Sequence, residues 1–236
     1  MAMTANKTPE TETPPYALCA GDSGAAVTLQ RRGIMLVLAS PPGGGKTTIS
    51  RAIAGLDPQT EISVSATTRQ MRPGEVHGQH YYFVSDEEFQ KMVDAKNMLE
   101  HALVYNKHYY GTPKAPVDKA LESGRDVLFD IDWQGNRSLA AIAPEDVVSV
   151  FLLPPTWDTL AERLHNRAQD SEEEISKRLS KAQDEIAHYK EFQYVIVNNN
   201  LDESIARVRA IIEAERLRRH RLPQLQGFID ILKPSK

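Results

Sequence analysis

Apolar residues fall in short runs separated by longer stretches with helical periodicity. Four of the runs predict buried strands: 34–39, 127–131, 147–152 and 194–197. Four stretches predict helices: 46–55, 156–167, 171–188 and 202–221. The strand runs are apolar enough to be covered on both faces, which is typical of parallel sheets. The alternation therefore predicts an α/β fold, with a three-layer core in which helices cover both faces of a parallel sheet.

A glycine-rich segment follows the first predicted strand directly and leads into the first predicted helix. It reads Ser40-Pro-Pro-Gly-Gly-Gly-Lys46-Thr47-Thr48. Glycines let successive N–H groups point into one concavity that accepts phosphate oxygens, and the helix N-terminus adds its positive dipole. The pattern G-x-x-x-x-G-K-[ST] has glycine where Ser40 stands. We expect Lys46 to reach the β- and γ-phosphates of a nucleotide and Thr47 to ligate Mg²⁺, whereas the alternative is an ordinary glycine-rich turn.

Residues 67–125 break this rhythm and are denser in tyrosine, histidine and arginine. They contain a strand-like piece at 81–84 and an amphipathic helix near 86–95. A polar, aromatic insertion in an α/β core is where we expect a second substrate. Arg69 and Arg72 lie three apart beside a Pro-Gly turn, and guanidinium groups suit phosphate capture, although surface arginines are the alternative.

Charged residues also mark the strand ends and a connection between helices. Asp130 and Asp132 end the predicted strand 127–131, and an acidic residue there commonly helps to hold Mg²⁺ beside a phosphate loop. Arg163 and Arg167 lie four apart on one predicted helix, and Arg178 lies near the apolar stripe of the next. A polyphosphate between these arginines would offset their repulsion, so we expect a closing lid; the alternative is that each reaches solvent.

Composition narrows the function further. The chain has 236 residues, a net charge of −4 and one cysteine, Cys19, which excludes an internal disulfide. Nothing in this balance favours nucleic acid or membrane as a partner, and no apolar run approaches the length of a membrane span. A basic cluster at 216–221 is expected to complement the dipole at a helix end. The cytoplasm is the expected compartment.

Taken together, these residues resemble guanylate kinase from about residue 31 to residue 219. Four segments carry the resemblance: 63–75 (Ser-Val-Ser-Ala-Thr-Thr-Arg-Gln-Met-Arg-Pro-Gly-Glu), 109–112 (Tyr-Tyr-Gly-Thr), 130–135 (Asp-Ile-Asp-Trp-Gln-Gly) and 177–180 (Lys-Arg-Leu-Ser). The resemblance implies a P-loop core with a GMP-binding insertion and a small helical lid. It implies the reaction ATP + GMP → ADP + GDP with Mg²⁺, with dGMP as a further candidate acceptor. Oligomeric state is left open.

The resemblance also implies roles for matching positions. Catalytic roles go to Lys46, Arg163, Arg167 and Arg178. ATP contacts go to Ser40, Pro41, Pro42, Gly43, Gly44, Gly45, Lys46, Thr47, Thr48 and, near the base, Asn198. The residues implied to bind the GMP phosphate are Ser65, Arg69, Arg72, Tyr81 and Tyr110, and those implied to bind guanine are Glu100, Thr112 and Asp132. Metal binding is expected at Thr47 and Asp130. Carboxylates suit guanine because its N1–H and 2-amino group are donors, whereas adenine N1 is an acceptor.

The expected division of the chain follows. Its parts are a disordered tail (1–30), core with the P-loop (31–66), GMP-binding segment (67–125), core (126–165), lid (166–188), core (189–221) and a C-terminal extension (222–236). Two departures from the family pattern stand out: Arg167-Ala168 replaces Arg-Gly, and one extra residue separates Glu100 from Tyr109. Two alternatives are an inactive guanylate-kinase-like binding module, which would lack the phosphate loop, and a GTPase, for which the guanine-reading N-K-x-D is missing.

Overall fold

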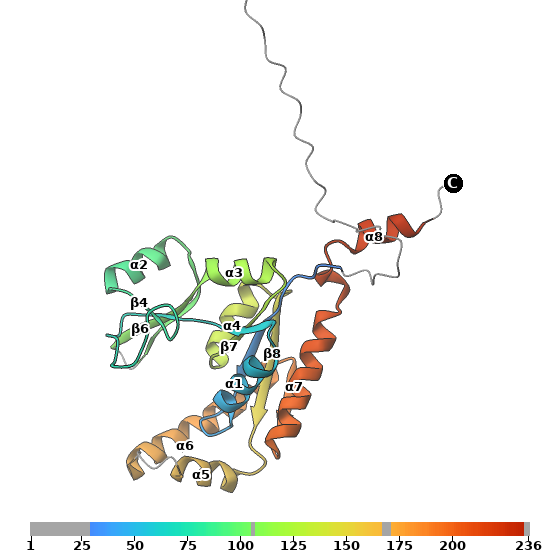
Figure 1. Ribbon diagram of the computed structural model, residues 1–236. Coiled ribbons are helices and arrows are strands. Elements are labelled where there is room, and N and C mark those ends of the chain that lie inside the picture. Colours follow the sequence, from blue (N-terminus) through green and yellow to red (C-terminus); the bar gives the residue numbers. More distant parts are fainter. Residues whose placement is uncertain (1–28, 105–106, 167–170, 234–236) are drawn as a thin grey trace, which may run out of the picture.

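A five-stranded parallel sheet forms the centre of the molecule (Figure 1). The structure, a computed structural model, describes residues 29–104, 107–166 and 171–233. The strand order is β2 (Thr60–Ile62), β7 (Asp126–Asp130), β1 (Met35–Ala39), β8 (Val147–Leu153) and β9 (Tyr194–Val197). The four predicted strands are confirmed. Strand β2 was not predicted, because it has three residues and only Thr60 is buried.

Strand β1 is buried on both faces, as its apolar run predicts. Met35, Val37 and Ala39 point into a core formed with α3 (Lys114–Glu122) and α4 (Trp133–Ile142). Leu36 and Leu38 point the other way, against α1 (Lys46–Leu56) and α7 (Leu201–Arg216). This alternation of successive side chains is the two-residue period of a strand. The three-layer α/β/α core is therefore confirmed.

A second, smaller sheet projects from the core (Figure 1, upper left). Its order is β4 (Tyr82–Phe83), β3 (Ala66–Thr67), β6 (His108–Pro113) and β5 (Met98–Val104). Helix α2 (Asp86–Asp94) packs on it through Phe89, which is 1% exposed. This helix confirms the one predicted near 86–95. Ser85 and Glu88 begin it with a reciprocal capping box, which satisfies backbone N–H groups at the helix start.

Two helices form the lower end of the molecule in Figure 1: α5 (Trp157–His165) and α6 (Glu172–Ile186). They pack through Leu160 and Leu164 of α5 and through Ile175 and Ala182 of α6. Ser171 and Glu174 form the second capping box, in which the Glu174 N–H donates to Ser171 Oγ at 3.3 Å. A 3₁₀ turn, η1 (Ala187–Glu191), leads from α6 to β9.

The prediction of one helix over 202–221 is wrong at its end. Helix α7 stops at Arg216, and a 3₁₀ turn, η2 (Arg219–Arg221), precedes helix α8 (Leu225–Leu232). The chain leaves the helix where Arg216 and Arg221 pair with carboxylates inside the protein. Arg216 forms ion pairs with Asp57 and with the fully buried Asp126, while Arg221 is 1% exposed and lies 3.8 Å from Glu215. These two arginines therefore hold the core together, rather than forming a solvated basic end.

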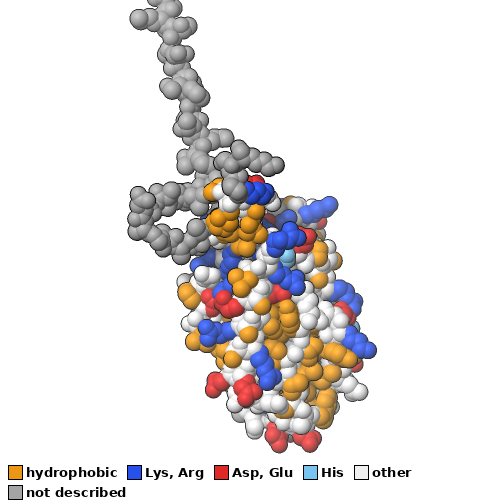
Figure 2. Space-filling view, turned by 90° about the vertical axis from the view of Figure 1, so that its right-hand side faces the viewer, with side chains coloured by type: hydrophobic (Ala, Val, Ile, Leu, Met, Phe, Trp, Pro, Cys, Tyr) orange, Lys and Arg blue, Asp and Glu red, His pale blue; other side chains and the backbone are white. Residues whose placement is uncertain are grey.

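The side of the molecule formed by α7 and α8 is shown in Figure 2. Basic and acidic side chains are interspersed over most of this face, and apolar atoms gather at its upper end, where α8 lies. Ile229, Ile231 and Leu232 are exposed there. None of the helices in the described ranges has the length and apolar character needed to cross a bilayer.

Replacing Gly33 with alanine is expected to destabilise the fold by about 1–3 kcal/mol or more, since overpacking forces the backbone to move. A Cβ on Gly33 would lie 1.9 Å from the carbonyl oxygen of Arg125, where β1 and β7 begin. Gly55 supplies a matched control in α1, because a Cβ there meets nothing within 4 Å. Gly55→Ala should gain about 0.5–1 kcal/mol through helix propensity. Urea unfolding measures both, and a Gly33→Ala variant as stable as the parent would contradict the close approach.

Candidate active site

The glycine-rich segment forms the turn between β1 and α1. Gly43 and Gly45 have φ of 84° and 97°, a left-handed conformation that favours glycine. The Gly44 N–H donates to the Pro41 carbonyl at 2.9 Å, which curls the turn. Gly45 is the N-cap of α1 and offers no side chain to cap it. The first amides of α1 therefore face a hollow, where the helix dipole favours an anion.

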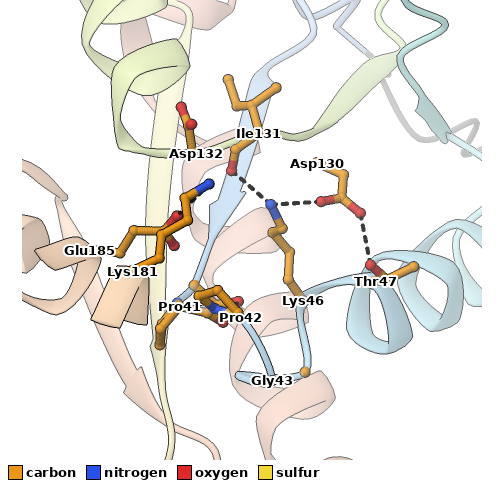
Figure 3. Close-up of a pocket in the computed structure, with 12 residues that line it drawn as sticks. Pro41, Pro42, Gly43, Lys46, Thr47, Asp130, Ile131, Asp132, Lys181 and Glu185 are labelled. Atoms are coloured by element: carbon orange, nitrogen blue, oxygen red, sulfur yellow. Dashed lines mark hydrogen bonds and ion pairs between the residues drawn. The ribbon is translucent and has the colours of Figure 1, made fainter. Parts of the chain in front are cut away.

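Lys46, Thr47 and Asp130 meet inside this hollow (Figure 3). Asp130 ends β7, which lies beside β1, and the carboxyl ends of parallel strands meet at one edge of a sheet. Lys46 Nζ lies 2.8 Å from Asp130 Oδ1 and donates to the Ile131 carbonyl at 3.0 Å. The Thr47 hydroxyl donates to Asp130 Oδ2 at 3.2 Å. One carboxylate thus holds both residues that were expected to contact triphosphate and metal.

Helix α6 supplies the opposite wall of this pocket, which has a volume of about 330 Å³. Lys181 and Glu185 line it, with Lys181 Nζ 3.3 Å from Glu185 Oε1 (Figure 3). Burial raises the pKa of Glu185, while the Lys181 ammonium acts in the opposite direction. Neither residue was identified from the sequence. The available signal was a charge at Glu185, three residues after Ala182 on the apolar stripe of the helix.

Two further hollows join this pocket on either side. The hollow beside α5 has a volume of about 370 Å³, shares Gly43 and Gly45 with the pocket, and is lined by Arg163 and Asn198. The hollow toward the small sheet, about 580 Å³, is joined to the pocket by residues that line both: Thr47, Asp130 and Ile131. It is lined by Ser65 and Tyr81 and by three residues that the sequence did not indicate: Ser50, Arg51 and His80. The phosphate loop therefore lies between two larger spaces.

The small sheet brings Arg69, Tyr81 and Tyr110 together. Arg69 lies over the Tyr81 ring at 5.4 Å, and the Tyr81 and Tyr110 rings are 5.9 Å apart. The Arg69 guanidinium donates to both carboxylate oxygens of Glu75, at 3.0 and 2.7 Å. This ion pair lowers the pKa of Glu75 to about 2 and raises that of Arg69. Arg72 is exposed nearby, and its backbone N–H also donates to Glu75, at 2.7 Å.

Glu100 and Thr112 face each other directly across β5 and β6. The Thr112 hydroxyl donates to Glu100 Oε1 at 2.7 Å, so the extra residue in the β5–β6 connection does not separate the two positions. Burial raises the pKa of Glu100, and the negative charge of Asp132 adds to this effect. Asp132 is the N-cap of α4 and accepts from the backbone N–H groups of Gln134 and Gly135 at 3.0 and 3.1 Å.

The structure describes two of the three arginines predicted to form a lid, Arg163 and Arg178. Arg163 on α5 donates from one terminal nitrogen to the carbonyl of Asn198 at 3.3 Å, and its other terminal nitrogen is buried. Arg178 is half-buried on α6. Arg167 and the neighbouring Ala168, the expected departure from the family pattern, lie outside the described residues, as does the predicted tail up to residue 28.

The donor set at the loop suits Mg²⁺. Within the described ranges, no group of three or more His, Cys, Asp and Glu side chains is arranged to hold a metal ion. Thr47 and Asp130 instead offer a hydroxyl and a carboxylate 3.2 Å apart. Such a sparse set of oxygen donors fits Mg²⁺, which keeps several waters and binds through one or two side chains and substrate phosphates.

Comparisons with known proteins bear on this site. The family model described as guanylate kinase matches residues 32–215. The chain is 55% identical over 206 residues to a guanylate kinase of Paramagnetospirillum magneticum, covering 87% of this chain and 96% of that one. It is 52% identical over 201 residues to a guanylate kinase of Nitrobacter winogradskyi, covering 85% and 91%. The crystal structure of guanylate kinase from Anaplasma phagocytophilum superposes with a TM-score of 0.70 at 32% identity, covering 88% and 99%.

Proposed function

Because the chain belongs to the guanylate kinase family, we propose that its three joined hollows hold ATP and GMP end to end, with the phosphate loop between them. The protein is an ATP:GMP phosphotransferase, which makes ADP and GDP. The observation that carries the arrangement is the sharing of lining residues: the central pocket shares Gly43 with the hollow on the lid side and Thr47 with the hollow beside the small sheet.

ATP occupies the lid side and the central pocket in this proposal. Its contacts are Ser40, Pro41, Pro42, Gly43, Gly44, Gly45, Lys46, Thr47, Thr48 and Asn198. Lys46 exchanges Asp130 for the β- and γ-phosphates, because its flexible stem can turn within the pocket. Thr47 and Asp130 hold Mg²⁺, which when bound neutralises charge on the phosphates.

GMP occupies the space beside the small sheet. Ser65, Arg69, Arg72, Tyr81 and Tyr110 bind its phosphate, which takes the place of the Glu75 carboxylate on the Arg69 guanidinium. Glu100, Thr112 and Asp132 read guanine. A carboxylate accepts from the N1–H and 2-amino groups of guanine, whereas adenine would leave it unpaired, which disfavours AMP. The same pocket admits dGMP as a candidate acceptor.

Transfer then rests on position and charge. The attacking phosphate oxygen of GMP is already ionised near neutral pH, so no strong general base is required. Lys46, Arg163, Arg167 and Arg178 stabilise the charge of the transferring group. Closure of the segment 166–188 onto the core, with 67–125 as the GMP-binding segment, excludes water and limits ATP hydrolysis. We place the reaction in the cytoplasm, and nothing in the site favours a nucleic acid or membrane partner.

A coupled assay of ADP release tests the function. ATP with GMP should give release that depends on GMP and on Mg²⁺, with dGMP as a weaker or equal acceptor. AMP, UMP and CMP in place of GMP should give release below about one hundredth of that rate. Release that is independent of GMP, or equal with AMP, would contradict the proposed reaction, and persistence of full activity in excess EDTA would contradict the metal.

A further inference from the structure

Asn198 is buried against the phosphate loop, directly after β9. The residue as a whole is 4% exposed. Its backbone N–H donates to the Leu153 carbonyl at 2.7 Å, which fastens this residue to the end of β8. A residue held by the sheet in this way has a fixed position relative to the core.

Both polar groups of the Asn198 side chain have partners inside the protein. Nδ2 donates to the Gly44 carbonyl at 3.0 Å, and Oδ1 accepts from the Ser204 hydroxyl at 2.9 Å. A carbonyl oxygen can only accept, so the nitrogen must be the atom that faces Gly44. The orientation of the amide is therefore fixed by the loop itself.

The loop fits this amide closely. A Cβ on Gly45 would lie 2.5 Å from Asn198 Nδ2, and Gly45 has a φ of +97°. The glycine at 45 thus serves two needs at once, because it permits the left-handed turn and leaves room for the amide. The backbone carbonyl of Asn198, in turn, accepts from a terminal nitrogen of Arg163 at 3.3 Å. One residue therefore contacts both the phosphate loop and a cation of the lid.

We propose that Asn198 is a positioning residue, which holds the phosphate loop in its anion-binding conformation and Arg163 at the edge of the same hollow. This inference rests on the proposed function and differs from a contact with the ATP base, the role that the family resemblance implies. The bonds to Gly44 and Ser204 each use one hydrogen-bonding position of the amide, and together they fix its orientation against the loop. A residue that positions the loop affects binding of the triphosphate of any nucleotide, whichever base the nucleotide carries.

The variant Asn198→Asp tests this directly, because it keeps the shape and replaces the donor that faces the Gly44 carbonyl with an oxygen. Binding of ATP, GTP, CTP and inorganic tripolyphosphate should weaken by the same factor, at least about tenfold, by calorimetry. GMP binding should be unchanged. Asn199→Asp, with the same charge change on an exposed neighbour, is the matched control and should alter these affinities less than about twofold.

Two outcomes would overturn the inference. One is an Asn198→Asp protein that binds tripolyphosphate normally but has a changed preference among ATP, GTP and CTP, since that is the behaviour of a base contact. The other is equal behaviour of the variants at 198 and 199. If Asn198→Asp does not fold, Ser204→Ala removes the partner of Oδ1, together with the bond from the same hydroxyl to the Asn200 carbonyl. It should weaken tripolyphosphate binding in the same direction, and unchanged binding would count against the inference. Tripolyphosphate binding can be measured even if the parent protein fails the GMP-dependent assay, so the two failures are distinguishable.

Discussion

Replacement of Lys46 by alanine is expected to lower kcat by about 10²–10⁴-fold, because it removes a positive charge from the pocket in which phosphoryl transfer is proposed. Lys46 is the side chain of α1 whose ammonium reaches across the pocket to Asp130 and the Ile131 carbonyl. The pair with Asp130 is only partly exposed, so its loss should lower the melting temperature modestly. Steady-state kinetics with ATP and GMP, alongside thermal unfolding, measure the two effects.

Lys177→Ala is the matched control for this variant. Lys177 lies on α6, is largely exposed, and pairs with Glu173 one turn away. Its removal should change kcat less than about twofold, in line with the small contribution of exposed ion pairs. Lys46→Arg adds a second comparison, because a broad planar guanidinium does not replace a compact ammonium in a tight loop. A Lys46→Ala protein with more than half the parent kcat would exclude the proposed role.

Glu100→Gln is expected to reduce the preference for GMP over AMP by about 10²-fold or more. The variant keeps one oxygen to accept from the Thr112 hydroxyl but replaces the charge with an amide, one end of which donates. The amide NH2 would then face the N1–H and 2-amino donors of guanine, which cannot accept from it. The N1 of adenine, in contrast, could accept from the same NH2. The ratio of kcat/KM for the two acceptors measures the effect. Glu87→Gln, on the exposed start of α2, is the control and should leave the ratio unchanged.

The same substitution should stabilise the ligand-free protein at neutral pH. Burial raises the pKa of Glu100 in the folded state, so the folded protein is destabilised as pH rises through that pKa. Glutamine does not titrate and escapes this loss. The melting temperature of Glu100→Gln should therefore exceed that of the parent at pH 8, and the difference should shrink toward pH 4. A constant difference across this range would show that the charge of Glu100 is not the cause.

Continuous apolar runs allowed the core to be predicted from the sequence, because only a strand covered on both faces can be apolar at every position, as β1 is. The short strand β2 and the end of α7 were not predictable in this way. Thr60–Ile62 becomes a strand because it pairs with β7, a contact distant in sequence. Arg216 ends α7 within reach of Asp57 and Asp126, which lie 159 and 90 residues earlier.

Site residues that belong to contiguous motifs were easier to predict than those gathered by the fold. The spacing of the glycine-rich loop predicts a phosphate site, and the place of Asp130 at a strand end predicts a metal-binding carboxylate. Lys181 and Glu185 reach the pocket only because α6 folds back over the loop. Their sequence signal, one charge on an apolar stripe, is shared by many surface helices. The ion pair of Arg69 with Glu75 was equally difficult to predict, because the two residues are six positions apart on either side of a Pro-Gly turn.

Glu75 and Asp130 are carboxylates of the protein that pair with the two cations proposed to bind the substrates. Arg69 and Lys46, the cations proposed to bind the two nucleotides, are each neutralised by a carboxylate of the protein itself. A small inorganic anion must therefore displace a carboxylate that belongs to the same chain and so has a high effective concentration. Such an anion makes few other contacts that could compensate. A nucleotide carries a base and a sugar that bind elsewhere in the hollows. We therefore expect free inorganic phosphate to compete poorly with nucleotides for these two cations.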